Sequence, residues 1–139
     1  MWAGIKGVDL IAIHEKEVWL IEVKDYREHP RTKTLDLAEE VARKVFDTLA
    51  ALLPAKIHAN EPAEKEFAKH VIQGQSLRVI LHLEQPRQHS KLRPRAIDPA
   101  DVQQKLRQTL KPIDPHPKVR ECGRMEGLPW QVSSIRDQT

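Results

Sequence analysis

Two apolar runs near the start of the chain, residues 8–13 and 18–23, stand on either side of a polar tetrad at residues 14–17. Both runs are rich in β-branched and aliphatic residues, which favours strands over a short helix. The tetrad therefore predicts a hairpin turn, although it lacks the Asn-Gly or Gly-Gly pair of the tightest turns. We expect the rest of the chain to be organised around this hairpin.

The register of the hairpin decides which side chains share a face. If the turn holds an even number of residues, Ile11 lies opposite Leu20 and Asp9 lies opposite Glu22. Lys24 projects from the same face as Glu22, because side chains alternate along a strand. Three charged groups therefore meet at one end of an otherwise apolar ribbon.

Burying Asp9, Glu22 and Lys24 beside apolar residues is costly unless the charges are compensated. One interpretation is structural, with Lys24 forming salt bridges to both carboxylates in a partly solvated strand end. The other is catalytic, because two carboxylates on paired strands offer hard oxygen ligands for Mg²⁺ or Mn²⁺. A lysine beside them supplies a cation for a water nucleophile or a phosphate oxygen. The second acid falls in register, which favours a site.

After the hairpin the apolar period becomes helical. Residues such as Ala38 and Val45 recur on one stripe, which predicts a helix over residues 35–53. Thr34 is the expected N-cap of this helix, and Pro54 is expected to end it. The helix would cover one face of the hairpin.

The remaining chain alternates between helical and strand patterns. The predicted elements are a helix at residues 60–74, a strand at 77–84, a helix at 98–110 capped by Asp98, and short strands near 118–122 and 130–135. The order β-β-α-α-β-α-β-β predicts an α/β domain with a mixed sheet and flanking helices. His82 and Glu84 on the third strand are possible further site residues, but the outward face of a strand normally carries such residues.

Size and composition narrow the class of protein. A chain of 139 residues predicts one domain, spanning residues 1–139. The formal net charge of +3 does not by itself indicate a nucleic-acid binder, because the distribution of charge matters more. Cys122 is the only cysteine, which excludes a disulfide framework and a cysteine-based zinc site. No secretory signal and no apolar run of about 20 residues is present, so we expect a cytoplasmic protein without a membrane span.

A basic segment at residues 85–97 contains four cationic side chains and no acid. It is either a solvated surface loop or a contact for backbone phosphates, which dominate nucleic-acid affinity without reading sequence. The polar stretch after the hairpin would assist it. The predicted nucleic-acid-binding residues are Arg27, Arg31, Lys33, Arg87, Lys91, Arg93 and Arg95.

Asp9 followed after twelve residues by Glu22-Val23-Lys24 resembles the PD-(D/E)xK nuclease superfamily, which has the restriction-endonuclease-like fold. The surrounding residues look particularly like its Holliday-junction-resolvase and restriction-enzyme-like branches. The resemblance implies that Asp9 and Glu22 bind Mg²⁺ or Mn²⁺ together with the carbonyl of Val23, and that Lys24 positions or activates the attacking water. There are two departures from the pattern: Val8 stands at the nominal proline, and only eight residues precede Asp9, where members usually have a helix.

The resulting hypothesis is a metal-dependent DNA endonuclease with a restriction-endonuclease-like core, in which Asp9, Glu22 and Lys24 are catalytic. One alternative is a non-cutting nuclease-like domain that binds DNA or a partner protein. Another is a structural α/β module whose acid pair is coincidental. Both faces of the hairpin are apolar, so we also expect a homodimer that covers the face left open by the absent helix.

Overall fold

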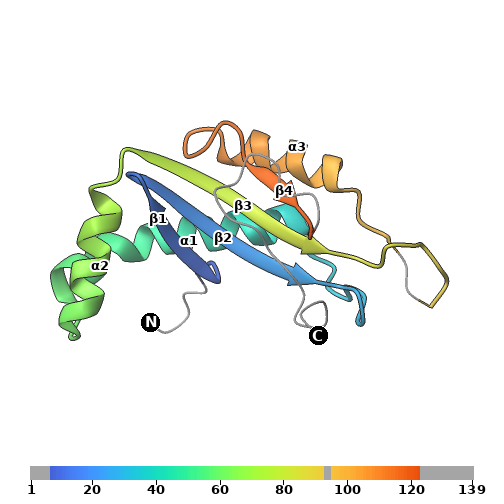
Figure 1. The fold of residues 1–139 in the computed structure, drawn as a ribbon, viewed down its shortest axis with the longest axis horizontal. Helices are drawn as coiled ribbons and strands as arrows, with labels where there is room; N and C mark the ends of the chain where they lie inside the picture. Colours follow the sequence, from blue (N-terminus) through green and yellow to red (C-terminus); the bar gives the residue numbers. More distant parts are fainter. Residues whose placement is uncertain (1–6, 93–94, 123–139) are drawn as a thin grey trace.

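The structure, a computed structural model, describes residues 7–92 and 95–122. In these ranges four strands and three helices follow one another in the predicted order (Figure 1). The elements are β1 (Leu10–His14), β2 (Glu17–Asp25), α1 (Leu37–His58), α2 (Pro62–Ile72), β3 (Ser76–Glu84), α3 (Pro99–Leu110) and β4 (Lys118–Arg120). The predicted α/β class with a mixed sheet is therefore confirmed, whereas a restriction-endonuclease-like core is not. The strand expected at residues 130–135 lies outside the described residues.

The four strands form one sheet in the order β1-β2-β3-β4. β1 and β2 are antiparallel with the predicted register, in which Ile11 lies opposite Leu20. β2 and β3 are parallel, as are β3 and β4. The hairpin turn is tighter than the polar tetrad suggests, because only Glu15 and Lys16 lie between the paired strand ends, and both have positive φ, 49° and 68°. Two such residues suit the right-handed twist of a hairpin even without glycine.

The hydrophobic core lies between one face of the sheet and the helices α1 and α3. Val18, Leu20 and Leu81 from the sheet are fully buried, as are Val41 of α1 and Leu106 of α3. α2 packs mainly against α1, and its last turn reaches β2, where Val71 joins the same core cluster as Val18. The covered face is the one that carries Glu22 and Lys24, because these residues alternate in phase with Leu20 on β2. α1 is thereby placed directly over the charged end of the hairpin.

The opposite face of the sheet has only a small apolar cluster among the described residues. Trp19, Ile21 and Ile80 are buried there, with Ala12 beside them. Leu10 and Val23 remain 57% and 42% exposed. The expectation that both hairpin faces are apolar is therefore met, with α1 and α3 covering one of them.

The predicted ends of the first helix are wrong. α1 begins at Leu37, after Asp36 rather than Thr34, and it continues through Pro54 to His58. A proline inside a helix removes one backbone hydrogen bond and crowds the preceding turn, but the last turns of α1 are supported by the packing of α2. No helix in the described ranges is long and apolar enough to span a membrane.

The other helix boundaries follow their local signals more closely. α2 begins with Pro62, as expected for proline in a first turn, although Glu61 rather than Asn60 precedes it as the cap. α3 follows Asp98, whose Oδ1 accepts a hydrogen bond from the Ala100 amide at 3.0 Å. This confirms Asp98 as a helix cap.

Candidate functional site

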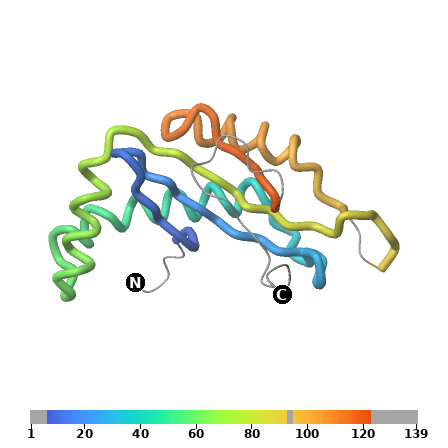
Figure 2. Tube along the Cα trace, in the orientation of Figure 1, coloured from blue at the N-terminus to red at the C-terminus, as the bar shows by residue number. Residues whose placement is uncertain are grey.

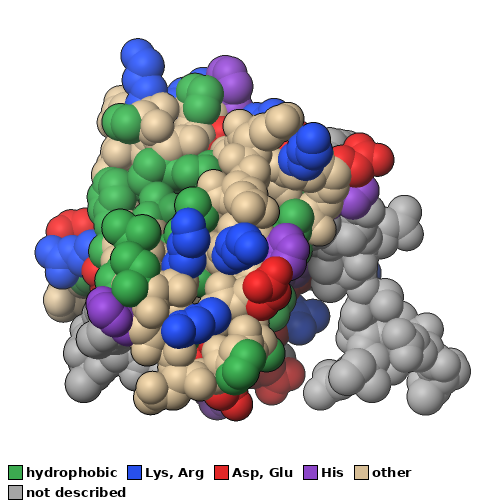
Figure 3. Space-filling model, turned by 90° about the vertical axis from the view of Figure 1, so that its left-hand side faces the viewer, with side chains coloured by type: hydrophobic (Ala, Val, Ile, Leu, Met, Phe, Trp, Pro, Cys, Tyr) green, Lys and Arg blue, Asp and Glu red, His purple; other side chains and the backbone are tan. Residues whose placement is uncertain are grey.

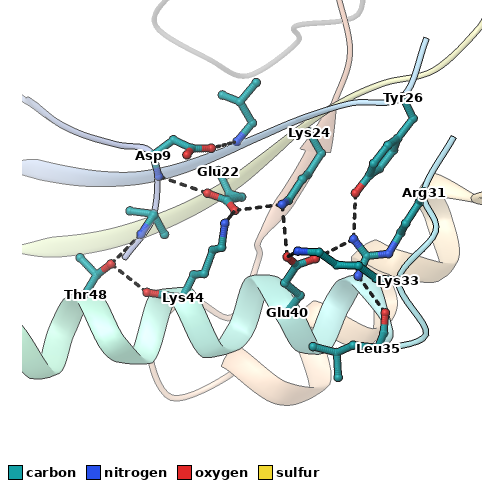
Figure 4. Close-up of polar contacts among 12 residues, drawn as sticks. Asp9, Glu22, Lys24, Tyr26, Arg31, Lys33, Leu35, Glu40, Lys44 and Thr48 are labelled. Carbon is teal, nitrogen blue, oxygen red and sulfur yellow. Dashed lines mark hydrogen bonds and ion pairs between the residues drawn. The ribbon is translucent and has the colours of Figure 1, made fainter. Parts of the chain in front are cut away.

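Asp9 and Glu22 lie side by side at the open end of the β1–β2 hairpin (Figure 4). The amide of Asp9 donates a hydrogen bond to Glu22 Oε1 at 3.1 Å. In return, the amide of Val23 donates to Asp9 Oδ2 at 2.8 Å. Each carboxylate therefore binds the backbone of the neighbouring strand, and the structure brings the two acids together as the register predicts.

Glu22 is neutralised mainly by Lys44, a residue of α1 that the sequence analysis missed. The side chain of Glu22 is 1% exposed, and its Oε2 forms an ion pair with Lys44 Nζ. Lys24 Nζ lies farther from the same oxygen, at 3.8 Å. The available signal for Lys44 was its position directly before the buried Val45, at the border of the apolar stripe of the predicted helix.

Glu40 of α1 is a third acid beside the hairpin end, and the sequence did not assign it to the site. Its carboxylate lies 3.3 Å from Lys24 Nζ, 2.6 Å from Arg31 Nη1 and 2.6 Å from Lys33 Nζ. Burial opposes the ionisation of Glu40, but the hydrogen bonds from Lys33 and Arg31 and the charge of Lys24 outweigh it and lower the pKa of Glu40 to about 2. Glu40 is therefore a permanent anion that gathers three cations (Figure 4).

The pKa values of the two acids at the hairpin end are shifted in opposite directions. Burial raises the pKa of Glu22, and the neighbouring Asp9 adds to this effect while Lys44 opposes it. Burial also acts to raise the pKa of Asp9, but the hydrogen bond from the Val23 amide and the charges of Lys44 and Lys24 lower it on balance. Asp9 is consequently the more firmly ionised member of the pair.

Three of the four carboxylate oxygens of this pair are already engaged by nitrogen donors. Glu22 Oε1 accepts from the Asp9 amide, Glu22 Oε2 pairs with Lys44, and Asp9 Oδ2 accepts from the Val23 amide. Across residues 7–92 and 95–122, no three His, Cys, Asp or Glu side chains converge so that they could hold a metal ion. In this arrangement the donor set does not fit Mg²⁺ or Mn²⁺, because the ion would have to displace Lys44. The Mg²⁺ site at Asp9, Glu22 and the Val23 carbonyl stays a prediction, and no reaction step is assigned to it.

Of the predicted nucleic-acid-binding residues after the hairpin, one is largely buried and two are exposed. The side chain of Arg31 is 10% exposed and binds Glu40, the Tyr26 hydroxyl and the Leu35 carbonyl, and these contacts hold the segment after β2 in place. Its role in nucleic-acid binding stays a prediction. The side chain of Lys33 is 60% exposed although it pairs with Glu40. Arg27 is also exposed, in an ion pair with Asp25.

The basic segment at residues 85–97 is partly held by its own side chains. Arg95 donates to the Pro86 carbonyl at 2.5 Å and lies 3.6 Å from Glu121, so it supports the loop. Arg87 and Lys91 are exposed. The remaining predicted residue, Arg93, lies outside the described residues.

His82 and Glu84 do not belong to the Asp9–Glu22 site. On β3 they alternate with Leu81, which pairs with Glu22, so they project from the opposite face of the sheet. There His82 Nε2 lies 2.8 Å from Glu84 Oε1, and Glu84 also accepts from the Cys122 amide. Their contacts favour the structural interpretation.

Comparison with known proteins gives no matching family model and no matching solved structure. Among curated proteins, the chain is similar to a cysteine–tRNA ligase from Neisseria meningitidis, with 33% identity over 154 aligned residues. The alignment covers 97% of this chain but 22% of the relative. The chain thus spans about a fifth of the length of the curated relative that it matches.

This similarity overturns the assignment to the PD-(D/E)xK nucleases, because the matched relative is named as a tRNA ligase and belongs to a different family. The predicted DNA endonuclease and the alternative of a non-cutting nuclease-like domain are wrong with it. The site at Asp9, Glu22 and Lys24 also rests on the hairpin register, and this similarity does not test it, so their roles stay predictions. The physical reason for the error is that two acids and a lysine at a hairpin end also arise in a salt-bridged strand end, where lysines compensate the acids.

Proposed function

We propose that this chain is an RNA-binding domain that holds backbone phosphates of a tRNA at the carboxyl ends of β2 and β3. The observation that carries the proposal is the 33% identity over nearly the whole chain to a segment of a tRNA ligase. Because the chain spans about a fifth of that relative, the proposal concerns RNA binding and not the joining of an amino acid to tRNA.

The position of the surface follows from the parallel pairing of β2 and β3. Asp25 lies opposite Glu84 at the end of this ladder, and the Tyr26 amide continues it by donating to the Glu84 carbonyl at 2.8 Å. The segments that follow the two strands therefore start next to each other. Figure 2 shows both segments at the end of the molecule opposite α2. We call their exposed cations, Arg27, Lys33, Arg87 and Lys91, the strand-end surface.

The charge behind this surface also favours an anionic partner. Lys24, Arg31, Lys33 and Lys44 outnumber Asp9, Glu22 and Glu40 by one charge. The exposed Lys33 amine is held beside Glu40, which is itself fixed on α1. A phosphate that approaches Lys33 meets a net positive cluster, and such contacts give affinity without sequence specificity.

The test is binding of a tRNA transcript, measured by fluorescence anisotropy over a series of salt concentrations. The triple variant Lys33→Gln, Arg87→Gln, Lys91→Gln removes three charges from the strand-end surface. The matched control Lys56→Gln, Lys65→Gln, Lys69→Gln removes three exposed charges from the end that carries α2. Each lost phosphate contact reduces the slope of log affinity against log salt by about 0.7 to 0.9, so the first triple should flatten it by about 2.

The control triple should leave the slope and the affinity close to wild type. Equal slopes for both triples would show that the strand-end surface does not touch RNA. Absence of tRNA binding by the wild-type chain would overturn the proposed function itself. A duplex DNA of similar length serves as the competitor that separates RNA preference from general phosphate binding.

We further propose a homodimer that forms through α1. Phe46, Leu53 and Ile57 are 44%, 57% and 52% exposed, and their spacing of seven and four residues places them on one side of the helix. Ala50 lies at the centre of this stripe, where a small side chain permits close approach. An antiparallel pair of α1 helices related by a two-fold axis would cover the stripe with itself. Apolar side chains also gather on the face that carries α2 (Figure 3).

A further inference from the structure

Lys44 occupies the place where a cation is needed beside the Asp9–Glu22 pair. Its ammonium group pairs with Glu22 Oε2, and its charge also acts on Asp9, where it helps to lower the pKa of that carboxyl. The side chain of Lys44 is 19% exposed, and that of Glu22 is 1% exposed. One mostly buried amine therefore serves both acids.

The backbone around Lys44 is fixed to the strand segment that carries Asp9. Thr48 Oγ1 donates to the Lys44 carbonyl at 2.8 Å and accepts from the Val8 amide at 2.9 Å. One hydroxyl thus joins α1 to the residue directly before Asp9. The fully buried Val45 anchors the same helical turn in the core. Lys44 is consequently held over the acid pair by both packing and hydrogen bonds.

Lys24, the lysine of the strand end, is a weaker partner for the pair. Its ammonium lies 3.3 Å from Glu40 and 3.8 Å from Glu22, so its charge is shared between two acids. Glu40 already pairs with Arg31 and Lys33 as well. Lys44 therefore supplies the main compensation for Glu22.

A divalent ion at this place would meet two obstacles. It would need Glu22 Oε2, which Lys44 holds, and its double charge would lie close to two ammonium groups. We infer that Lys44 replaces a divalent cation and keeps the Asp9–Glu22 pair free of metal, and that removing its charge converts the pair into a divalent-cation site. This inference does not depend on RNA binding.

The test is Mn²⁺ binding by the full chain, measured as the loss of the free-ion electron paramagnetic resonance signal and as a thermal shift. The variant Lys44→Met keeps an unbranched apolar chain of the same length up to Cε but removes the charged amine. We expect wild type to show no Mn²⁺-dependent shift at millimolar Mn²⁺, and Lys44→Met to bind one ion at least tenfold more tightly. Adding Glu22→Gln to Lys44→Met should abolish the gained binding.

The matched control is Lys33→Met, which removes an exposed amine from the neighbouring Glu40 contacts and leaves Lys44 in place. It should gain no affinity. Lys44→Gln provides a second variant in case Lys44→Met folds poorly. If the wild-type chain binds Mn²⁺ and Glu22→Gln abolishes that binding, the pair already holds a metal ion and the inference is wrong. This outcome does not depend on whether the Lys44 variants fold. Folded Lys44 variants that bind no Mn²⁺ would overturn it as well.

Discussion

The ammonium group of Lys24 lies 3.3 Å from the carboxylate of Glu40, across the contact between β2 and α1. The same amine lies 3.8 Å from Glu22 on its own strand. The lysine that the sequence groups with two strand acids is therefore shared with a helix. Glu40 becomes the acid on which Lys24, Arg31 and Lys33 converge, so it joins α1 to the segment that follows β2.

Replacing Glu40 with Gln should destabilise the protein at neutral pH. The substitution removes the carboxylate that pairs with the largely buried Arg31 and the nearer of the two that flank Lys24. Breaking a buried ion pair in this way costs about 3–5 kcal/mol. Urea denaturation at pH 7 measures the change in unfolding free energy. The matched control Glu39→Gln removes an exposed surface ion pair with Arg43 and should change that free energy by less than about 1 kcal/mol.

The difference between wild type and Glu40→Gln should shrink in acid. The folded-state pKa of Glu40, about 2, lies below its ordinary value of 4.5, so the folded protein binds fewer protons at this group than the unfolded chain. The resulting stability is fully present above about pH 4.5 and is lost as the pH falls towards 2. Both proteins keep Asp9 and Glu22, so the titration of these groups largely cancels in the comparison. An equal difference in unfolding free energy at pH 7 and near pH 2 would contradict the role of the Glu40 charge.

Asp114→Ala should be strongly destabilising, because Asp114 is a buried acid that binds two backbone amides. Its side chain is 1% exposed, and it accepts hydrogen bonds from the Val79 amide at 2.8 Å and from the His116 amide at 2.9 Å. Truncation leaves a buried strand amide without its acceptor, at a cost of about 1–3 kcal/mol. Chemical denaturation measures the loss, with the exposed Asp101→Ala on α3 as the control. Similar unfolding free energies for both variants would show that the Asp114 contacts contribute little.

Gly74→Ala should overpack the contact between the end of α2 and β2. A Cβ at this position would lie 2.5 Å from Val18 Cγ2 and 3.1 Å from the Val71 carbonyl oxygen. Relief requires movement of a fully buried valine or of the backbone, at a cost of about 1–3 kcal/mol. The double variant Gly74→Ala, Val18→Ala should lose less stability than the sum of the single variants, because the clashing methyl group is gone. Additive losses in thermal or urea unfolding would place the strain elsewhere.

Leu53→Glu should dissociate the proposed homodimer. A carboxylate within the exposed α1 stripe would be buried against the apolar stripe of the partner helix, where its desolvation opposes association. Light scattering at micromolar concentration should give twice the monomer mass for wild type and the monomer mass for Leu53→Glu. Lys65→Glu on α2 introduces a new acid outside the stripe and should remain dimeric. A monomeric wild type would contradict the dimer and the stripe as its interface.

The parts of the fold that follow from local pattern were predictable from the sequence. The two adjacent apolar runs predicted the β1–β2 hairpin, and an even number of residues in its turn then gave the observed register, with Ile11 opposite Leu20. Asp98 followed by proline determined the start of α3 through a contact two residues away. The pairing of Asp9 with Glu22 belongs to the same class, since it depends only on hairpin register.

The tertiary structure decided everything that depends on which helix face meets the sheet. Lys44 and Glu40 reach the hairpin end because α1 packs over Glu22 and Lys24. The position of Lys44 at the border of the apolar stripe places it near the sheet, but it does not identify Glu22 as the partner. Pro54 remains inside α1 because a neighbouring helix supports the turn, which local propensity does not register. The same packing changes the interpretation of the two carboxylates, Asp9 and Glu22. By themselves, two acids in register are suitable ligands for a metal ion. In the folded protein the amine of Lys44 on α1 compensates their charge instead, because a buried carboxylate requires a nearby cation and α1 places one there.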